Sequence, residues 1–429
     1  MPHGSDTAKK HVARVLEKGS VEELRQRLEP RSDAPAPRIP GASLTTPEAI
    51  GRRWKLLENS ESKDILCPPS AVGVADQYKK NIENYIGELR MPVGLAGPLR
   101  VNGLYAQGDF YLPLATTEAA LVASYARGCL TISEAGGCTS VLLMEGVSRA
   151  PGFAFRTLSE AGIFVGWLVD QTETLKQIAG TTTNHGQLED VSIQIEGNHA
   201  YLILEYTTGD AAGQNMVTIA TQAVYDHVLA HSPVAPAYHF IEANMSGDKK
   251  ASAQSFQSVR GKKVSAEVRL DAKLLKKRLR CTAKGMENYW RMSALGGVMS
   301  GTIGVQGHYA NGLAALYLAT GQDVACVAES AVGVTRFEAN EDGSLYASVT
   351  LPNLIVGTVG GGTGLPTQRA GLEMLGLAGA GNAKALAEVC AGLALAGEIS
   401  IIGALAAGEF SRAHQKLARG KGEPSGDAQ

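Results

Sequence analysis

The pattern of apolar and polar residues predicts hairpins alternating with long helices. Residues 99–111 alternate in character around Asn102-Gly103, a dipeptide suited to the positive φ angles of a tight hairpin turn. Residues 7–28 have the spacing of an amphipathic helix. Residues 391–408 are almost continuously apolar, but Glu398 lies in their middle. A charge at that point favours a buried helix over a membrane span.

The hairpin is expected to lead into a helix around which the chain is organised. Thr116 or Thr117 is predicted to cap this helix by accepting a hydrogen bond from a free backbone amide. Glu118 then falls in the first turn, where the helix dipole favours a carboxylate. Dipole compensation alone explains a glutamate there, whereas an acid catalyst also needs neighbours that raise its pKa. Ala120, Ser124 and Gly128 form a ridge of small residues on this helix. The ridge predicts that another element packs closely against the helix.

Residues 151–240 predict a unit of their own, inserted into a larger domain. The expected strands are 152–158, 190–196, 200–206 and 237–241, and the expected helices are 162–179 and 215–229. This βαββαβ order is the split pattern of a ferredoxin-like domain. The residues before and after the unit share one style of sequence, rich in Ala and Gly, so we expect 87–150 and 241–429 to form one large helix-rich domain.

Residues 1–86 predict a small helical region ahead of that domain. A Pro-rich connector occupies residues 29–40, and short helices are expected between residues 46 and 79. The Gly and Pro residues of 86–99 predict a loop system. The fold class is therefore α+β, with a large helix-rich domain, an inserted βαββαβ domain and a small helical N-terminal domain.

Composition narrows the class further. The 429 residues are 44% hydrophobic, which is enough for two or three domains with a substantial core. A net charge of −2 gives no general electrostatic reason to bind nucleic acid or an anionic membrane. The N-terminus lacks the apolar core of a signal peptide. The cysteines are scattered and lack the paired spacing of a metal site, so we expect them to be reduced core residues of a cytoplasmic protein. They are Cys67, Cys129, Cys138, Cys281, Cys326 and Cys390.

Several polar loops carry candidate chemistry. Residues 207–216 form a turn between a strand and a helix, which either presents amides to a phosphate or serves for capping alone. Asp248-Lys-Lys250 lies in a polar loop with Arg260 shortly after it. A solvated charge run accounts for this composition, but Lys249 beside an aspartate is also a fixed cation able to polarise a carbonyl oxygen.

The last third adds weaker candidates. His308 and Asn311 lie one turn apart, and a histidine in such a setting is more often a hydrogen-bonded core residue than a catalyst. Asp323 follows a glycine break and fits a helix cap equally well. Residues 354–366 form a glycine loop after a strand, without the dinucleotide fingerprint of a Rossmann unit. His414 lies near a basic tail.

Together these motifs resemble 3-hydroxy-3-methylglutaryl-coenzyme A reductase, from about Glu83 to about Lys416. Their order and spacing carry the resemblance, in the segments Glu83-Asn-Tyr-Ile-Gly, Pro92-Val-Gly-Leu-Ala-Gly-Pro-Leu99, Ala115-Thr-Thr-Glu118, Gly209-Asp-Ala-Ala-Gly-Gln-Asn215, Asp248-Lys-Lys250, Gly321-Gln-Asp323, Gly357-Thr-Val-Gly-Gly-Gly362 and Leu405-Ala-Ala-Gly with His414. The lysine loop is similar to that of the branch shared by eukaryotes and archaea (class I), here without a membrane anchor.

The resemblance implies a four-electron reduction of a thioester to mevalonate and free coenzyme A. Its catalytic set is Glu118, Lys249, Asp323 and His414. In that set Lys249 is expected to stabilise the oxyanion, and His414 is expected to protonate the leaving thiolate. The resemblance further implies that Glu118 donates a proton to the aldehyde oxygen, while Asp323 raises the proton affinity of Glu118 and hydrogen-bonds Lys249.

The resemblance also implies binding residues and partners. Arg149, Asp248, Lys250 and Asn311 are the expected substrate contacts. Nicotinamide-cofactor contacts are expected at Asp210, Ala211, Ala212, Gly213, Gln214, Asn215, Gly360 and Gly361, which makes 151–240 the cofactor domain. NADPH is favoured by branch, and NADH stays open. A homodimer or a dimer of dimers, with active sites at the interface, is implied, with no nucleic acid or membrane partner.

The chain departs from the family pattern at three positions. Ala212 and Gln214 stand where the family usually has methionines, which could alter the fit of the cofactor. Glu242 stands where a serine commonly contacts the substrate carboxylate, so either Glu242 turns away or the acyl group differs. The alternatives are therefore a reductase of another acyl-CoA, an oxidative mevalonate-degrading enzyme or a non-catalytic CoA-binding scaffold. Retention of all four ionisable catalytic residues argues against the scaffold.

Overall fold

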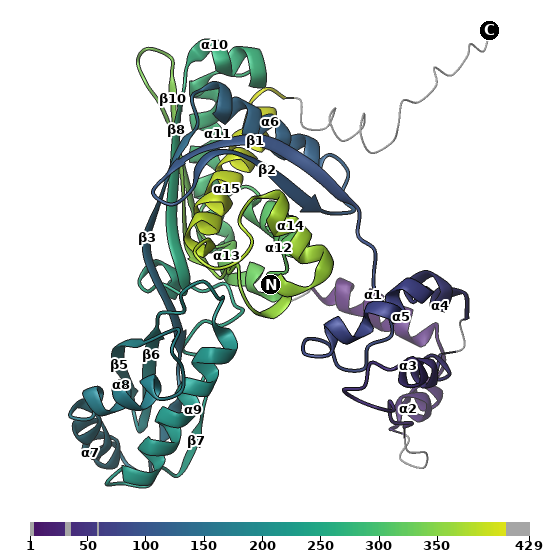
Figure 1. Ribbon diagram of the computed structural model, residues 1–429, viewed down its shortest axis with the longest axis vertical. Coiled ribbons are helices and arrows are strands. Elements are labelled where there is room, and N and C mark those ends of the chain that lie inside the picture. The colour runs from purple at the N-terminus through teal and green to yellow at the C-terminus, as the bar shows by residue number, and fades with distance from the viewer. Residues whose placement is uncertain (1–3, 31–35, 58–59, 409–429) are drawn as a thin grey trace. The chain divides into compact units, whose positions relative to one another are not determined.

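The computed structural model describes residues 4–30, 36–57 and 60–408 (Figure 1). The chain separates into two compact units, Met1–Glu88 and Leu89–Gln429. The smaller unit is helical, as predicted, with α1 Ser5–Leu16, α2 Val21–Leu28, α3 Pro47–Trp54, α4 Ser60–Leu66, α5 Pro69–Val74 and the short 3₁₀ helix η1 Ala75–Tyr78. The single helix predicted for residues 7–28 is wrong. Ser20 and Glu23 form a capping box that begins α2, so the segment folds as two helices.

In the larger unit, ten strands form one sheet among residues 89–408. They are β1 Val93–Gly103, β2 Gln107–Ala115, β3 Cys138–Arg149, β4 Gly152–Ala154, β5 Leu188–Glu196, β6 His199–Tyr206, β7 Tyr238–Phe240, β8 Gly261–Leu270, β9 Val334–Ala339 and β10 Leu345–Leu354. The main path runs β7-β4-β6-β3-β8-β10-β9, with the β1–β2 hairpin joined at β3 and β5 joined at β6. Every pairing except β1 with β3 is antiparallel.

The helices of the larger unit lie over this sheet and at its ends (Figure 1). They are α6 Leu121–Glu134, α7 Leu158–Val169, α8 Thr172–Gly180, α9 Gln214–His231, α10 Ala272–Leu274, α11 Ala283–Ser300, α12 Tyr309–Thr320, α13 Val327–Ser330, α14 Pro366–Met374 and α15 Ala383–Ala406, with short helices η2 Ala253–Phe256, η3 Leu275–Leu279, η4 Val324–Cys326 and η5 Gly361–Gly364. The α+β class is as predicted.

The predicted hairpin is confirmed, but its turn is displaced. Asn102 is paired with Gln107 at the end of the two strands, so the turn is made by residues 103–106. A buried carboxylate decides this register. Glu388 of α15 accepts hydrogen bonds from the amides of Tyr105 and Ala106, both at 2.8 Å. Such a long-range anchor leaves no signal in the local sequence.

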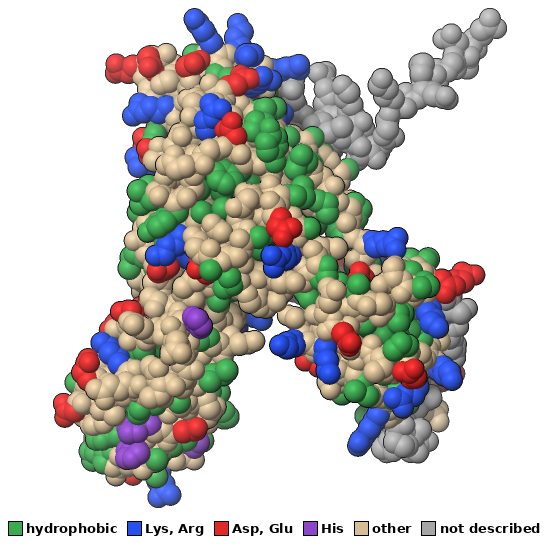
Figure 2. All heavy atoms as spheres, viewed as in Figure 1, with side chains coloured by type: hydrophobic (Ala, Val, Ile, Leu, Met, Phe, Trp, Pro, Cys, Tyr) green, Lys and Arg blue, Asp and Glu red, His purple; other side chains and the backbone are tan. Residues whose placement is uncertain are grey.

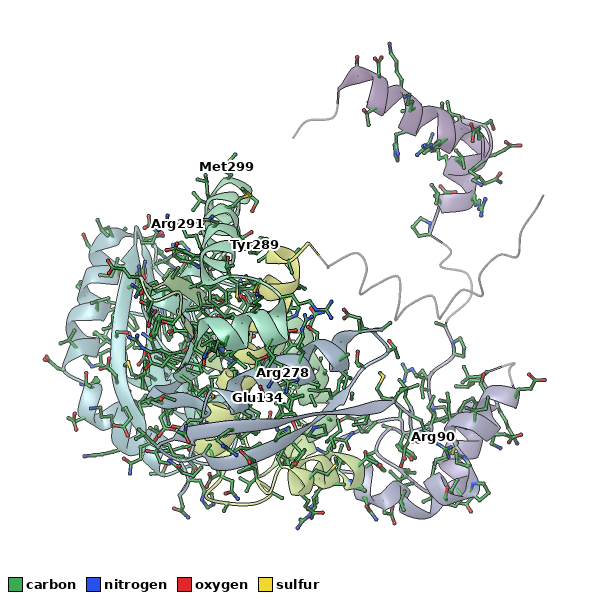
Figure 3. The ribbon with its side chains drawn as sticks, turned by 90° about the horizontal axis from the view of Figure 1, so that it is seen from above. Arg90, Glu134, Arg278, Tyr289, Arg291 and Met299 are labelled. Carbon is green, nitrogen blue, oxygen red and sulfur yellow. The ribbon has the colours of Figure 1, made fainter. Side chains whose placement is uncertain are left out.

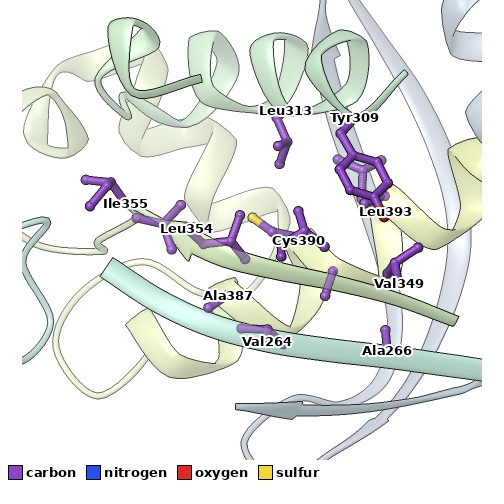
Figure 4. Close-up of a cluster of buried hydrophobic side chains, with 14 of the residues drawn as sticks. Val264, Ala266, Tyr309, Leu313, Val349, Leu354, Ile355, Ala387, Cys390 and Leu393 are labelled. Atoms are coloured by element: carbon purple, nitrogen blue, oxygen red, sulfur yellow. The ribbon is translucent and has the colours of Figure 1, made fainter. Parts of the chain in front are cut away.

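Helix α15 is the core element of the larger unit. Figure 4 shows Ala387, Cys390 and Leu393 of this helix packed between strands and α12. The helix is long and apolar enough to cross a membrane, but 83% of its apolar stretch is buried within the protein. Glu398 is fully buried and accepts a hydrogen bond from the amide of His308. The prediction of a buried helix is therefore confirmed.

Helix α6 packs closely on α15 through its small residues. The Ser124 hydroxyl lies 2.9 Å from the Ser400 hydroxyl. A side chain added at Gly128 would overlap the backbone of Ala396. The small-residue ridge predicted for this helix is thus confirmed at two of its three positions. The exception is Ala120, which precedes the helix as a left-handed residue with φ of 70°.

The segment from β4 to β7 has the predicted βαββαβ order. Strand β4 lies between β6 and β7, and β5 joins the other side of β6. The single helix expected for residues 162–179 is instead two helices, α7 and α8, divided near Asp170. Strand β6 also pairs with the end of β3, which connects this segment to the remainder of the sheet.

The distribution of charge and thiols agrees with the composition. On the face shown in Figure 2, acidic and basic side chains are interspersed around the upper end of the larger unit. No surface of one charge sign is visible at that end of the larger unit (Figure 2). All six cysteines are free and buried, as predicted for reduced core residues.

Candidate active site

The lysine loop, residues 241–252, holds an ion pair with the turn that follows α12. The Lys249 ammonium lies 2.9 Å from a carboxylate oxygen of Asp323, and both side chains remain about two-fifths exposed, at 43% and 40%. The hydrogen bond and charge of Asp323 raise the pKa of Lys249. The other carboxylate oxygen of Asp323 accepts from the amide of Ala325 and caps η4. Asp323 therefore does both things that its sequence position allowed.

Asp248 is held by two arginines. Its carboxylate pairs with Arg260 and lies 3.2 Å from the Arg149 guanidinium. Arg149 also donates to the Thr218 hydroxyl at 3.2 Å. The ammonium of Lys250 donates to the backbone oxygen of Asp248 at 2.7 Å. Three predicted substrate contacts, Arg149, Asp248 and Lys250, are thus brought together next to Lys249.

Glu118 does not lie in a helix, contrary to prediction. Helix α6 begins only at Leu121, after a turn in which Ala120 is left-handed, and no side chain caps it. Thr116 does accept a hydrogen bond, at 3.0 Å, but from the amide of Glu118 itself. Thr117 makes no cap either. The helix dipole therefore does not explain Glu118, because its carboxylate is an exposed group on the loop between β2 and α6.

The partner of Glu118 is Asn311, in the first turn of α12. The Asn311 amide nitrogen lies 3.1 and 2.9 Å from the two carboxylate oxygens of Glu118. His308 precedes this helix and is a core residue, stacked on Tyr125 with ring centroids 5.2 Å apart. Burial lowers the pKa of His308 to about 4, so the ring is neutral near pH 7. The interpretation of His308 as a core histidine is therefore confirmed.

The candidate residues fall into two groups at opposite ends of α12. Asn311 holds Glu118 near the start of the helix, and Asp323 holds Lys249 just after its end. Twelve helical residues span about 18 Å. No hydrogen bond or ion pair between Glu118 and Asp323 is present among residues 89–408. The effect of Asp323 on the proton affinity of Glu118 that the resemblance implies therefore stays a prediction.

The two predicted cofactor loops lie side by side. The amide of Thr358 donates to the backbone oxygen of Asp210 at 2.8 Å, and Ala211 is bridged to Val359. The Asp210 carboxylate accepts from the amides of Gly381 and Ala383, at 2.7 and 3.1 Å, at the beginning of α15. Its side chain therefore anchors the loop to the core helix.

The glycine loop keeps an open backbone. Gly360 and Gly361 have φ angles of 75° and 53°, and no atom lies near the space that a side chain would occupy at either position. Gly357 is fixed by the side chain of Gln322. The Gly357 amide donates to the side-chain oxygen at 2.9 Å, and the Gly357 carbonyl accepts from the side-chain nitrogen at 3.0 Å. One end of the loop is thus rigid, and the other presents bare backbone.

Two of the residues that depart from the family pattern, Gln214 and Glu242, have hydrogen-bond partners within the chain. Gln214, the first residue of α9, directs its side-chain amide to the Cys326 thiol at 2.7 Å. This contact joins the start of α9, where Asn215 follows and Ala212 and Gly213 precede Gln214, to η4, which Asp323 caps. The carboxylate of Glu242 accepts from the amides of Asn244 and Ala150, at 2.8 and 3.3 Å. Glu242 is therefore satisfied by its own chain.

Three buried groups beside the site were not predicted to contribute to it. Glu329 accepts from the amide of Lys249, Gln322 supports the glycine loop, and Lys262 donates to the backbone oxygen of Val356 just before that loop. For Glu329 the signal was a lone glutamate in an apolar stretch, and Gln322 lay within the Gly321-Gln-Asp323 motif. His414 lies outside the described residues. No cluster of three metal-ligating side chains occurs in the described part of the chain.

The fold and site define an α+β enzyme that combines a carboxylate-bound lysine, an amide-held glutamate and two adjoining glycine-bearing loops. A family model described as hydroxymethylglutaryl-coenzyme A reductase matches residues 49–419. The chain belongs to the hydroxymethylglutaryl-coenzyme A reductase family, which confirms the resemblance predicted from its motifs.

Relatives and solved structures agree. The 3-hydroxy-3-methylglutaryl-coenzyme A reductase of Haloferax volcanii is 44% identical over 372 residues, covering 85% of this chain and 92% of that one. The enzyme of Pyrococcus horikoshii is 43% identical, covering 79% and 84%. A class II reductase from Streptococcus pneumoniae, solved bound to NADPH, has a TM-score of 0.62 at 20% identity and covers 83% of this chain and 96% of that one. This last comparison shows a shared fold.

Proposed function

We propose that this chain reduces 3-hydroxy-3-methylglutaryl-CoA to mevalonate and free CoA, consuming two NADPH. The observation that carries the proposal is the half-exposed Lys249, held at 2.9 Å by Asp323 in a chain of this family. The relatives at 43–44% identity are named for this substrate. The product belongs to isoprenoid biosynthesis.

Lys249 stabilises the oxyanion that forms at the thioester carbonyl. A preorganised cation is effective here because its position is fixed before charge develops on the substrate. Asp323 keeps the ammonium charged, since it raises the pKa of Lys249. Arg149, Lys250 and the paired Asp248 supply the polar surface beside it, on which the substrate carboxylate binds.

Glu118 is the proton donor of the second reduction. Its carboxylate is exposed and is oriented by Asn311, so a proton can be delivered from a fixed direction. His414 is the acid for the coenzyme A thiolate, by its match to the family motif. The residues assigned to catalysis are therefore Glu118, Lys249, Asp323 and His414.

The two adjoining loops fit a nicotinamide dinucleotide. Gly360 and Gly361 offer bare backbone, and residues 210–215 lead into the start of α9, where free amides suit a phosphate. The bound cofactor supplies hydride. We assign residues 151–240 to its binding and residues 87–150 and 241–429 to the substrate. Lys176 is already paired with Glu173 at 3.4 Å, so NADPH is proposed by family branch, with NADH as the competing cofactor.

We propose a homodimer, or a dimer of dimers, whose active sites lie between copies. The separation of Glu118 from Lys249 by the length of α12 supports it, because a second copy can bring the two groups together. The end of α11 also exposes apolar side chains that no other element covers among residues 89–408. Figure 3 shows Tyr289, Arg291 and Met299 along this helix, with Met299 at its free end. The exposed apolar side chains there are Met292, Leu295, Val298 and Met299.

We place the chain in the class I branch and in the cytoplasm. Archaeal relatives and a Dictyostelium discoideum relative at 35% identity support the branch. The six buried, free cysteines are consistent with a reducing compartment.

A substrate panel tests the function and its main alternative. Purified protein is expected to oxidise NADPH with 3-hydroxy-3-methylglutaryl-CoA and to be much slower with acetoacetyl-CoA. The reverse preference would identify a reductase of another acyl-CoA. It would also direct attention to Gln214 and Ala212, since Glu242 is already hydrogen-bonded within the chain.

A further inference from the structure

Lys249 has a backbone conformation that needs support. Its φ is 56°, in the left-handed region that side chains other than glycine rarely occupy. Gly247, two residues earlier, is also left-handed with φ of 69°. The lysine loop contains no helix or strand that would impose these angles. Contacts with other elements must therefore hold Lys249 in place.

One segment holds Lys249 at both ends. Glu329, in α13, accepts a hydrogen bond from the Lys249 backbone amide at 3.2 Å. Asp323, six residues earlier, accepts from its side-chain ammonium at 2.9 Å. Two fixed points, one on the backbone and one at the tip, define the direction of a flexible four-carbon side chain.

Glu329 is itself a costly group to bury. Its side chain is fully buried, and one carboxylate oxygen has no hydrogen-bond partner in the described part of the chain. The nearest cation is Arg260, whose Nε lies 3.5 Å from the oxygen that binds Lys249. Arg260 also pairs with Asp248 and donates to the backbone oxygen of Ser148 at 2.7 Å. Arg260 therefore fixes Glu329 and Asp248, the residue before Lys249, relative to each other.

We propose that Glu329 is a positioning residue of the reductase, which fixes the catalytic Lys249 by accepting its backbone amide. The proposal rests on the proposed function of Lys249 as the oxyanion donor. Glu329 touches no substrate and acts through the lysine. Its loss should therefore lower kcat, while binding of either substrate changes little.

Three substitutions separate this role from simple charge balance. Glu329→Gln keeps an acceptor oxygen at the same reach, so kcat should stay within about threefold of wild type. Glu329→Asp keeps the charge but withdraws the oxygen by one methylene, and Glu329→Ala removes it. Both should lower kcat by about 10- to 100-fold, with each KM within about threefold. A residue that only neutralises Arg260 would give the opposite order, with Asp close to wild type and Gln impaired.

The matched control is Glu388→Gln. Glu388, in α15, is another fully buried carboxylate, and it accepts hydrogen bonds from backbone amides of the β1–β2 turn. This variant should lower the melting temperature and leave kcat per folded enzyme unchanged.

Wild-type kcat in folded Glu329→Ala or Glu329→Asp, when Lys249→Ala is inactive, overturns the positioning role. Wild type without turnover, or with turnover that Lys249→Ala does not reduce, means that the proposed function itself has failed. If Glu329→Ala does not fold, the order of the Asp and Gln variants decides.

Discussion

Among the described residues, the orientation of Glu118 depends on one side chain. The amide of Asn311 binds both carboxylate oxygens, so this neutral donor sets the direction of the acid without adding a charge. A charged residue at position 311 would change that balance. A negative charge there would repel the Glu118 carboxylate and would remove the hydrogen bonds that orient it.

We expect Asn311→Asp to lower kcat by about 10- to 100-fold, because it replaces a donor by a like charge at hydrogen-bond distance. Steady-state kinetics of the purified variant measure this loss. The control is Asn81→Asp, which makes the same charge change at an exposed position in the smaller unit. Equal kinetics for the two variants would contradict the role of Asn311.

The pH dependence of Lys249 follows from Asp323. The pKa of Lys249 is raised by this carboxylate, so the ammonium persists above its ordinary pKa and is lost only as the pH rises through the raised value. Asp323→Asn removes the charge but keeps an oxygen to cap η4. The alkaline limb of the kcat profile should therefore move to lower pH. An unchanged limb would show that Lys249 does not titrate in that limb.

At the scale of elements, the small-residue ridge of α6 predicted close packing, and the contact of α6 with α15 is where the structure shows it. Gly128→Ala adds a methyl group where the backbone of Ala396 already lies, so it should destabilise the protein by about 1–3 kcal/mol. Gly162→Ala, in α7, meets no atom and should stabilise the protein by up to about 1 kcal/mol, because alanine favours the helical conformation more than glycine does. Chemical denaturation of both variants measures the difference. Equal midpoints would mean that the helices can move apart freely.

Local pattern predicted most elements but not their junctions. The order of β4 to β7, the buried α15 and the glycine loop all followed from periodicity and turn residues. The place of Glu118 did not, because the left-handed Ala120 delays the start of α6, and alanine gives no sign of that conformation. Glu329 was missed for another reason. Its partners, Lys249 and Arg260, are 80 and 69 residues away, and only the fold brings them together.

At the scale of the whole molecule, the described part of one chain does not bring Glu118 into contact with Lys249 and Asp323. Glu118 and Lys249 are separated by α12, and the apolar end of α11 is exposed. We therefore expect the protein to have the mass of a dimer or tetramer in solution. Leu295→Glu, at a side chain that is 63% exposed, should shift it toward monomer and reduce activity in parallel. Light scattering after size exclusion measures the mass, and a fully active monomer would contradict an active site between copies.

The central claim concerns the reaction, and its stoichiometry tests it most directly. The measurement is nicotinamide absorbance at about 340 nm, with limiting 3-hydroxy-3-methylglutaryl-CoA, for wild type and for Lys249→Ala, using NADPH and then NADH. Transfer of four electrons requires two cofactor molecules oxidised per thioester, and loss of the preorganised cation should abolish turnover. One cofactor per thioester, no turnover by folded wild type with either cofactor, or an unimpaired Lys249→Ala variant would contradict the account.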